Sequence, residues 1–301
     1  MKRFFTKLVV FLILFVAVDT VAGYVFKMIN DGVVKGDYGR NNFIMKDMTG
    51  KNLLIFGSSR AIHHYDPEIM GDALDLTCYN CGEDGMGIIL SFCRFNAVLK
   101  RYTPKMIIYD IEVSYDLAKD DNAKYLGKLN MFYPDNELEQ VYNDVSATEK
   151  YKMMSHLYRF NSQLAEIFIQ RVSSSPEYAR DATFYPLTGR LNYMPKLPRP
   201  YDIDVDSLKV KYLNLFISKC KEHQIQLFFA VSPKFLMRQD RELSILKEIC
   251  FQRKIPLLNH YNDTTFTLHR ELFVDPVHLN LEGSKEYSKV ISSEIKNYIK
   301  R

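Results

Sequence analysis

The sequence is poor in cysteine, and the cysteines it has form no disulfide framework. There are five, Cys78, Cys81, Cys93, Cys220 and Cys250, so at least one is unpaired within the chain. Cys78 and Cys81 have the spacing of half a zinc site, but neither a second cysteine pair nor a His-x-x-x-His motif completes it. We therefore expect all five to be structural thiols, and we expect no metal site.

Concentrated positive charge is also missing from most of the chain. The 40 basic and 36 acidic residues leave a net charge of +4, and no run of lysine and arginine with interleaved aromatic residues appears. Nucleic-acid binding needs a basic face that neutralises phosphates, so we do not expect this class of protein. Repeats and low-complexity tracts are absent as well. With 47% apolar residues, the 301-residue chain has the balance of a folded globular protein and the length for one α/β domain with an insertion.

The longest apolar run lies at the N-terminus, after three basic residues in the first seven positions. It extends from Leu8 to Val18 and, after Asp19, a second apolar stretch continues to Phe26. A membrane span needs about 20 residues, and a charge near one end of such a helix costs a few kcal/mol. We predict that residues 1–30 form a signal anchor, a transmembrane helix. Retained positive charge would place the rest of the chain on the extracytoplasmic side, in the periplasm or cell envelope.

The N-terminal apolar run has two alternative interpretations. Its uninterrupted part, Leu8 to Val18, also suits the core of a cleaved signal peptide, although Thr20-Val21-Ala22 is a poor cleavage site. A buried N-terminal helix of the domain would carry polar residues at helical spacing within the run, and it has none there. We favour the retained anchor, followed by one domain over residues 31–301.

From residue 52 onward, short apolar runs alternate with helix-like stretches, as in strands joined by crossover helices. Strands are predicted at 52–56, 76–79, 106–111, 226–231 and 256–259. Helices are predicted at 66–74, 88–102, 147–171, 207–221, 240–253 and 282–299. The pattern predicts an α/β fold, a doubly wound parallel sheet of about five strands that binds ligands beyond the carboxyl ends of its strands. Residues from about 117 to 205 break the alternation and are expected to form a helical and loop insertion over the sheet rim.

Polar and glycine-rich segments follow the first two predicted strands. Ser58 and Ser59 come directly after Gly57, where a hydroxyl can be exposed beside the backbone N–H groups that open a helix. Three glycines between Gly82 and Gly87 allow the backbone to turn and present N–H groups to a ligand. Each segment alone serves a plain turn equally well, and the glycine spacing does not match a dinucleotide-binding fingerprint.

A third segment, before the last predicted helix, contains Asp275 and His278 in a turn that Pro276 stiffens. A lone histidine is more often structural than catalytic. An aspartate three residues earlier, however, can orient the imidazole, fix its tautomer and stabilise its protonated form. The other ring nitrogen could then take a proton from a serine.

Together, Gly57-Ser58-Ser59, Asn80-x-Gly82-x-x-Gly85 and Asp275-x-x-His278-Leu-Asn-x-x-Gly283 resemble motifs of the SGNH (GDSL-like) hydrolases, over about residues 52 to 299. The resemblance implies a flavodoxin-like sheet and no cofactor. It implies Ser59 as nucleophile, His278 as general base and Asp275 as the residue that orients it. The N–H groups of Gly85 and Ser59 would form the oxyanion hole.

The sequence departs from that family in two motifs. Ser58 stands where the first motif usually has aspartate. The third motif, Gly-x-Asn-Asp, should follow the third strand, but residues 109–116 read Tyr-Asp-Ile-Glu-Val-Ser-Tyr-Asp. The asparagine that donates to the oxyanion is therefore missing. Weak activity, a replacement donor such as Ser114, and an inactive scaffold all remain open.

The resemblance implies a serine esterase or O-acyltransferase acting on ester-linked acyl groups, with O-acetyl groups of an extracytoplasmic polysaccharide as the expected substrate. Tyr185, Arg190, Asn192 and Tyr193 of the insertion could bind sugar rings or could instead close the insertion's own core. The alternative is a catalytically inactive, membrane-anchored accessory protein that binds a glycan in an envelope-polymer modification system. A lipase that acts on membrane lipids is a third hypothesis.

Overall fold

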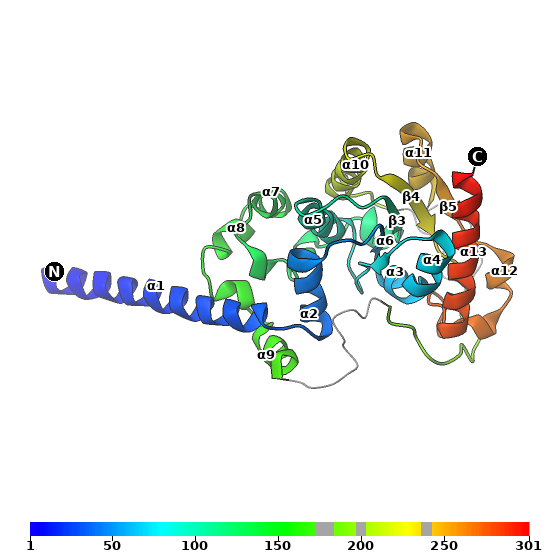
Figure 1. Ribbon diagram of the computed structural model, residues 1–301. Coiled ribbons are helices and arrows are strands. Elements are labelled where there is room, and N and C mark those ends of the chain that lie inside the picture. Colours follow the sequence, from blue (N-terminus) through cyan, green and yellow to red (C-terminus); the bar gives the residue numbers. More distant parts are fainter. Residues whose placement is uncertain (173–183, 197–202, 236–242, 301) are drawn as a thin grey trace. The chain divides into compact units, whose positions relative to one another are not determined.

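The computed structural model describes residues 1–172, 184–196, 203–235 and 243–300 (Figure 1). The chain divides into two compact units. Met1–Asp47 and Asn122–Ala182 form one, which we call the anchor unit, and Met48–Asp121 and Thr183–Arg301 form the other, the sheet unit. Residues 122–182 of the expected insertion thus group with the N-terminal segment, and the remainder of the insertion belongs to the sheet unit.

The sheet unit is built on five strands, β1 (Leu53–Gly57), β2 (Cys78–Asn80), β3 (Met106–Asp110), β4 (Gln226–Val231) and β5 (Leu257–Asn259). They lie in the order β2-β1-β3-β4-β5, and every neighbouring pair is parallel. This is the doubly wound, flavodoxin-like order, so the predicted fold is confirmed. Gly57, Asp110 and Ala230 are aligned in register, and the three central strands therefore end at one edge.

The helices of this unit lie near their predicted positions. They are α3 (Ser59–His64), α4 (Pro67–Leu74), α5 (Ile88–Leu99), α6 (Val113–Asp116), α10 (Ser207–Glu222), α11 (Ser244–Arg253), α12 (Thr264–Thr267) and α13 (Leu281–Ile299), with a 3₁₀ turn, η7, at Arg270–Leu272. The first residues of the helix predicted at 240–253 lie outside the described residues. The five cysteines are free thiols, and all but Cys78 are buried.

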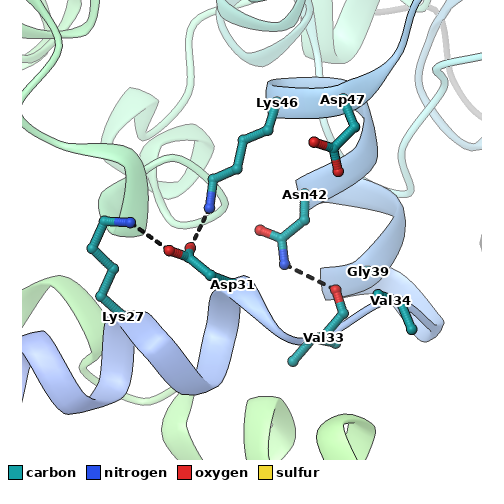
Figure 2. Close-up of a pocket in the computed structure, with 8 residues that line it drawn as sticks. All are labelled: Lys27, Asp31, Val33, Val34, Gly39, Asn42, Lys46 and Asp47. Carbon is teal, nitrogen blue, oxygen red and sulfur yellow. Dashed lines mark hydrogen bonds and ion pairs between the residues drawn. The ribbon is translucent and has the colours of Figure 1, made fainter.

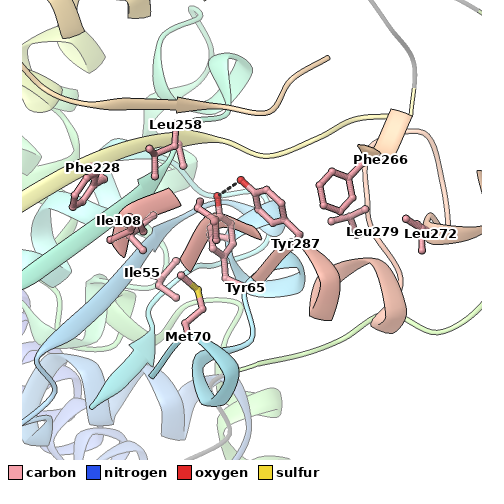
Figure 3. Close-up of a cluster of buried hydrophobic side chains, with 14 of the residues drawn as sticks. Ile55, Tyr65, Met70, Ile108, Phe228, Leu258, Phe266, Leu272, Leu279 and Tyr287 are labelled. Carbon is pink, nitrogen blue, oxygen red and sulfur yellow. Dashed lines mark hydrogen bonds between the residues drawn. The ribbon is translucent and has the colours of Figure 1, made fainter. Parts of the chain in front are cut away.

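Both faces of the sheet are covered, which is why its strands are apolar throughout rather than alternating. On one face, Ile55 and Ile108 pack in a cluster with Tyr65, which follows α3, and Tyr287 of α13 (Figure 3). On the other, Phe56 lies 5.6 Å from Phe216 of α10, ring centre to ring centre. Burying a side chain of this size contributes about 1.5–3 kcal/mol.

Helix α13 begins at a polar cap that also secures two loops. The side-chain oxygen of Asn280 accepts the N–H of Gly283 at 3.0 Å, as an N-cap does. Its amide nitrogen donates to the carbonyl oxygens of Gly189 (3.1 Å) and Glu271 (2.7 Å). One buried amide thus satisfies three backbone groups, and it fixes the start of α13 directly after His278.

The anchor unit is helical. Its elements are α1 (Lys2–Asp31), α2 (Gly36–Asn42), a π-helical turn η1 (Phe43–Asp47), α7 (Asn136–Val145), α8 (Glu149–Lys152), α9 (Leu164–Val172) and 3₁₀ turns η2 (Asn122–Leu126), η3 (Asn130–Phe132) and η4 (Tyr158–Phe160). Within the described residues, α1 is the one helix that is long and apolar enough to cross a membrane. By length and composition it suits a membrane anchor or a signal sequence.

The single helix predicted at 147–171 is wrong. Three short helical segments, α8, η4 and α9, occupy that stretch. The N–H groups of His156 and Leu157 donate to the carboxylate of Asp19 rather than to carbonyls one turn earlier. A distant partner therefore interrupts a pattern that locally favours a continuous helix.

The end of α1 is tied to the elements that follow it. Asp31 forms ion pairs with Lys27 of α1 and Lys46 of η1 (Figure 2). Asn42 of α2 donates to the carbonyl oxygen of Val33 at 3.1 Å. These residues line a cavity of about 240 Å³. Lys27 and Lys46 share the one carboxylate of Asp31, so this trio leaves a net charge of +1 at the cavity.

Replacing the cap of α13 should destabilise the sheet unit. Asn280→Ala removes the cap and takes the donor from the carbonyls of Gly189 and Glu271, at a cost of about 1–3 kcal/mol. We expect a lower urea midpoint for the full chain in detergent. Glu286→Ala, an exposed change on the same helix, is the control and should stay within about 0.5 kcal/mol. An Asn280→Ala midpoint equal to that of the control would contradict the assignment.

Candidate active site

Ser59 lies at the sharp turn between β1 and α3. Gly57 ends the strand with φ of +138°, which L side chains rarely adopt, and a Cβ there would lie 2.5 Å from the carbonyl oxygen of Asp110. The next residue, Ser58, precedes α3 and is fully buried, whereas Ser59 opens the helix and is partly exposed. The turn therefore presents the hydroxyl of Ser59 to solvent, and not that of Ser58.

His278 is held in a turn organised around one carboxylate. Oδ1 of Asp275 accepts the N–H groups of Val277 and His278, each at 2.8 Å. Oδ2 of the same carboxylate lies 2.8 Å from Nδ1 of His278. The N–H of Val274 donates to the carbonyl oxygen of His278 at 3.0 Å and closes the turn. The aspartate thus fixes both the backbone and the ring of the histidine.

The structure brings Ser59 and His278 together across the sequence. Nε2 of the imidazole lies 2.8 Å from Oγ of Ser59. Because an ionised carboxylate only accepts, Nδ1 of His278 carries the proton and Nε2 faces the serine O–H as an acceptor. Partial burial raises the pKa of Asp275, but hydrogen bonds from His278 and Val277 outweigh burial and hold the pKa below its ordinary 3.8. Asp275 is therefore an anion at neutral pH.

His64 supports this arrangement from beneath. Its Nε2 accepts the N–H of Leu279 at 3.0 Å, so its Nδ1 donates to Oγ of Ser232, also at 3.0 Å. Complete burial, with a smaller contribution from the Arg60 cation, holds the pKa of His64 well below 6.5. The residue is thus a neutral imidazole, and it fixes the backbone directly after His278.

The adjacent His63 is in the opposite state. Its Nδ1 lies 2.5 Å from the carbonyl oxygen of Tyr185 and its Nε2 lies 3.0 Å from a carboxylate oxygen of Asp84. Both partners only accept, so both ring nitrogens donate and the ring is an imidazolium. Burial lowers the pKa of His63, but the Asp84 carboxylate and the Tyr185 carbonyl outweigh it and raise the pKa above 6.5. This cation lies beside the site, its ring centre 5.7 Å from that of His278.

Arg60 connects the ends of three strands under the site. Its guanidinium donates to the carbonyl oxygens of Ile111 (2.6 Å) and Ser232 (3.0 Å). It also forms ion pairs with Asp110 at 3.2 Å and Glu112 at 2.9 Å. The arginine side chain is 2% exposed, so these four groups replace the water that it gives up.

The same network occupies the place of the expected third motif. Burial raises the pKa of Glu112, but Arg60 and Lys234 outweigh it and lower the pKa to about 2. Ser114, the suggested replacement donor, directs its hydroxyl to Glu112 at 3.0 Å. In this state it is engaged in the network rather than aimed at a substrate. The segment after β3 thus builds the floor of the site.

Gly85 lies in the turn between β2 and α5. It has φ of +66°, and a Cβ there would meet nothing within 4 Å. The preceding residue, Asp84, is the partner of His63, which connects this turn to α3. Asn80 donates to the carbonyl oxygen of Ala61 at 2.6 Å and adds a second connection. The turn is therefore held beside the helix that carries Ser59, and an oxyanion role for the Gly85 N–H stays a prediction.

One part of the insertion runs along the turn that carries His278. The N–H of Leu191 donates to the carbonyl oxygen of Phe273 at 2.6 Å, and Leu187 pairs with Asn280. Leu191 is buried. The neighbouring side chains of Arg190, Asn192 and Tyr193 are exposed, so they do not close the insertion's core, whereas Tyr185 is half-buried.

Sequence reasoning missed Arg60, His63 and His64. A signal was present, because His63 follows Ser59 by four residues and His64 follows Arg60 by four. On a helix this spacing puts each pair on one face. The partners of these side chains, on other strands and loops, had no local signal.

Fold and geometry together define an α/β protein with a parallel sheet and a Ser–His–Asp arrangement at its carboxyl edge. No family model and no curated protein matches the chain. A solved structure described as "a putative platelet activating factor from Streptococcus pneumonia" is similar over 96% of this chain and 99% of its own, at 10% identity and a TM-score of 0.43. Within the described residues, no three His, Cys, Asp or Glu side chains form a group that could hold a metal ion.

Removing the arginine under the site should unfold the sheet unit readily. Arg60→Met leaves the buried carboxylate of Asp110 without its cation and Glu112 with Lys234 alone, at a cost of about 3–5 kcal/mol. Urea denaturation of the full chain in detergent measures this loss of stability. Adding Glu112→Gln to Arg60→Met should restore part of the loss, because one of the two buried charges disappears. The assignment would be wrong if Arg60→Met left the urea midpoint unchanged, or if the double variant were less stable than the single one.

Because both ring nitrogens of His63 donate hydrogen bonds, we predict that its contribution to thermal stability depends on pH. Its pKa is raised above 6.5 in the folded state, so the connection contributes fully below pH 6.5 and is lost as pH rises through the raised value. His63→Phe removes this titration. As pH rises from 6.5 through the raised pKa of His63, we expect the thermal midpoint of the wild type to fall more steeply than that of the variant. Parallel curves would show that His63 is not charged in the folded state.

Proposed function

We propose that the chain is a serine esterase or O-acyltransferase that cleaves ester-linked acyl groups. The observation that carries the proposal is the linked geometry of Ser59, His278 and Asp275, with both connecting distances at 2.8 Å. These residues combine a nucleophile, a base and an orienting anion, which activates serine for acyl transfer.

In the proposed reaction, Oγ of Ser59 attacks the ester carbonyl while Nε2 of His278 takes the hydroxyl proton. Asp275 stabilises the resulting imidazolium. The tetrahedral intermediate expels the alcohol, which receives the proton from His278, and the acyl group stays on Ser59. Water or a sugar hydroxyl then attacks the acyl-enzyme, with His278 again taking and returning a proton. Hydrolysis and transfer share every step except the identity of this acceptor.

Stabilisation of the oxyanion is the weaker part of the proposed machinery. The N–H groups of Ser59 and Gly85 are the proposed donors, and no asparagine follows β3. Loss of one such donor typically lowers turnover by about 10²–10³-fold. We therefore expect slow turnover of simple esters, and an acyl-enzyme that is easier to detect than product.

The proposed substrate is an O-acetylated polysaccharide outside the cytoplasm. The apolar helix α1 supports a location at a membrane. Arg190, Asn192 and Tyr193 extend, exposed, from the segment that runs along the His278 turn, and polar and aromatic side chains of this kind suit sugar hydroxyls and ring faces.

Labelling with a fluorophosphonate and hydrolysis of p-nitrophenyl acetate test the proposal on the full chain in detergent. Wild type should be labelled, and Ser59→Ala should lose the label and lower hydrolysis by about 10³-fold or more. Ser58→Ala is the matched control and should keep both activities. Its hydroxyl is buried, and nothing among the described residues hydrogen-bonds to it.

The absent asparagine favours a second candidate, a catalytically inactive accessory protein that binds a glycan. If wild type is not labelled and its slow hydrolysis survives Ser59→Ala, this candidate replaces the enzyme. A lipase would prefer p-nitrophenyl palmitate to the acetate, so comparing the two esters separates the third hypothesis.

A further inference from the structure

The anchor unit contains a surface that fits a membrane, and the argument starts from α1. From Lys2 to Val18 every residue of this helix is exposed. These 17 residues extend for about 26 Å at 1.5 Å each, close to the ~30 Å of a hydrocarbon core. Basic residues at 2, 3 and 7 can reach the far headgroups with their long side chains.

Contact with the rest of the anchor unit begins abruptly at Asp19. Its carboxylate accepts hydrogen bonds from the hydroxyl of Ser155 (2.5 Å) and from the N–H groups of His156 (2.8 Å) and Leu157 (3.1 Å). Asp19 is 8% exposed. One turn later, a Cβ on Gly23 would lie only 2.2 Å from Cβ of His156. We call these contacts the Asp19 junction. Because it holds polar backbone against the helix, the hydrocarbon layer has to end near Asp19.

Beyond the junction, α1 still exposes large apolar side chains, together with Thr20 and Lys27. Val21, Tyr24 and Met28 are 60–64% exposed. A helix that left the membrane for water at Asp19 would gain nothing from these side chains. They suit the interfacial layer next to the hydrocarbon, where tyrosine is enriched.

A second exposed group lies immediately before the residues of the junction. Tyr151 and Met154 are 63% and 71% exposed, and Lys150 and Lys152 flank the tyrosine. The ammonium of Lys150 lies 5.3 Å from the centre of the Tyr151 ring. Buried Met153 holds this segment to the unit through its carbonyl, which accepts from Arg159 at 2.9 Å. We call residues 150–154 the interface patch.

We propose that the interface patch inserts into the headgroup layer of the bilayer that α1 crosses, at a depth set by the Asp19 junction. Tyr151 and Met154 supply the apolar contact, and Lys150 is matched to anionic lipid headgroups, whereas Lys152 is paired with Glu149 at 2.5 Å. The patch directly precedes the residues that bond to Asp19, so the helix and the patch reach the same lipid layer. The proposal does not depend on the catalytic function.

The sequence contains no tryptophan, so a single introduced tryptophan reports on its own position by fluorescence. Tyr151→Trp creates a single reporter in the full chain, reconstituted into phosphatidylglycerol–phosphatidylcholine vesicles. We expect blue-shifted emission, stronger quenching by a lipid spin-labelled at the headgroup than by one labelled at the chain end, and weak quenching by iodide. Phe251→Trp, on α11 of the sheet unit at a side chain 82% exposed, is the control and should be quenched by iodide. Leu12→Trp should respond to the chain-end label.

Two further variants separate the parts of the proposal. Adding Lys150→Gln to Tyr151→Trp should reduce headgroup quenching of the reporter in anionic vesicles. Adding Asp19→Ala to Tyr151→Trp should abolish that quenching, whereas a Leu12→Trp reporter should stay embedded in the same background.

Three results would overturn the proposal. The first is iodide quenching of the Tyr151→Trp reporter equal to that of the Phe251→Trp control. This comparison does not need the Asp19→Ala variant, so it decides the question even if that variant fails to fold. The second is stronger quenching of the Tyr151→Trp reporter by the chain-end label than by the headgroup label. The third is a blue shift that appears only when a protein partner is added.

Discussion

The site depends on one buried cation. Arg60 follows Ser59 in the chain, and its guanidinium joins the ends of β1, β3 and β4 by donating to two carbonyls and pairing with two carboxylates. Desolvating an arginine costs several kcal/mol, so the arrangement is stable only while every partner is in place. This requirement makes the arginine a constraint on geometry, because moving any one strand end leaves a buried charge unmatched.

Two neighbouring histidines extend that constraint to the loops. His64, neutral and fully buried, fixes the backbone after His278, whereas the charged His63 joins α3 to the turns at Asp84 and Tyr185. Their opposite states follow from their partners: a backbone N–H requires an acceptor, and a carboxylate and a carbonyl require donors. The hydroxyl of Ser59 and the ring of His278 thus face each other from elements that are fixed independently.

Much of the fold could be predicted from the sequence because its signals are local. Buried parallel strands are continuous apolar runs, and all five strands lie within two residues of their predicted positions. Ser59, Asp275 and His278 could be singled out because each lies in a turn with its own pattern. The Arg60 network could not, since its partners lie 50 and more residues away on other strands. The prediction of one helix at 147–171 was wrong for the same reason. The N–H of His156 donates to the carboxylate of Asp19, which lies 137 residues away in the sequence.

The junction between α1 and residues 155–157 also dictates an order of events during synthesis. Asp19 leaves the ribosome 136 residues before Ser155. At 5–20 residues per second the interval is roughly 7–27 s. Throughout that time α1 has no protein partner for its carboxylate, although the apolar run before it is ready to enter a bilayer. With α1 as the proposed membrane anchor, the nascent chain would keep a charged residue solvated at the membrane border until residues 155–157 are made, and insertion would precede completion of the fold.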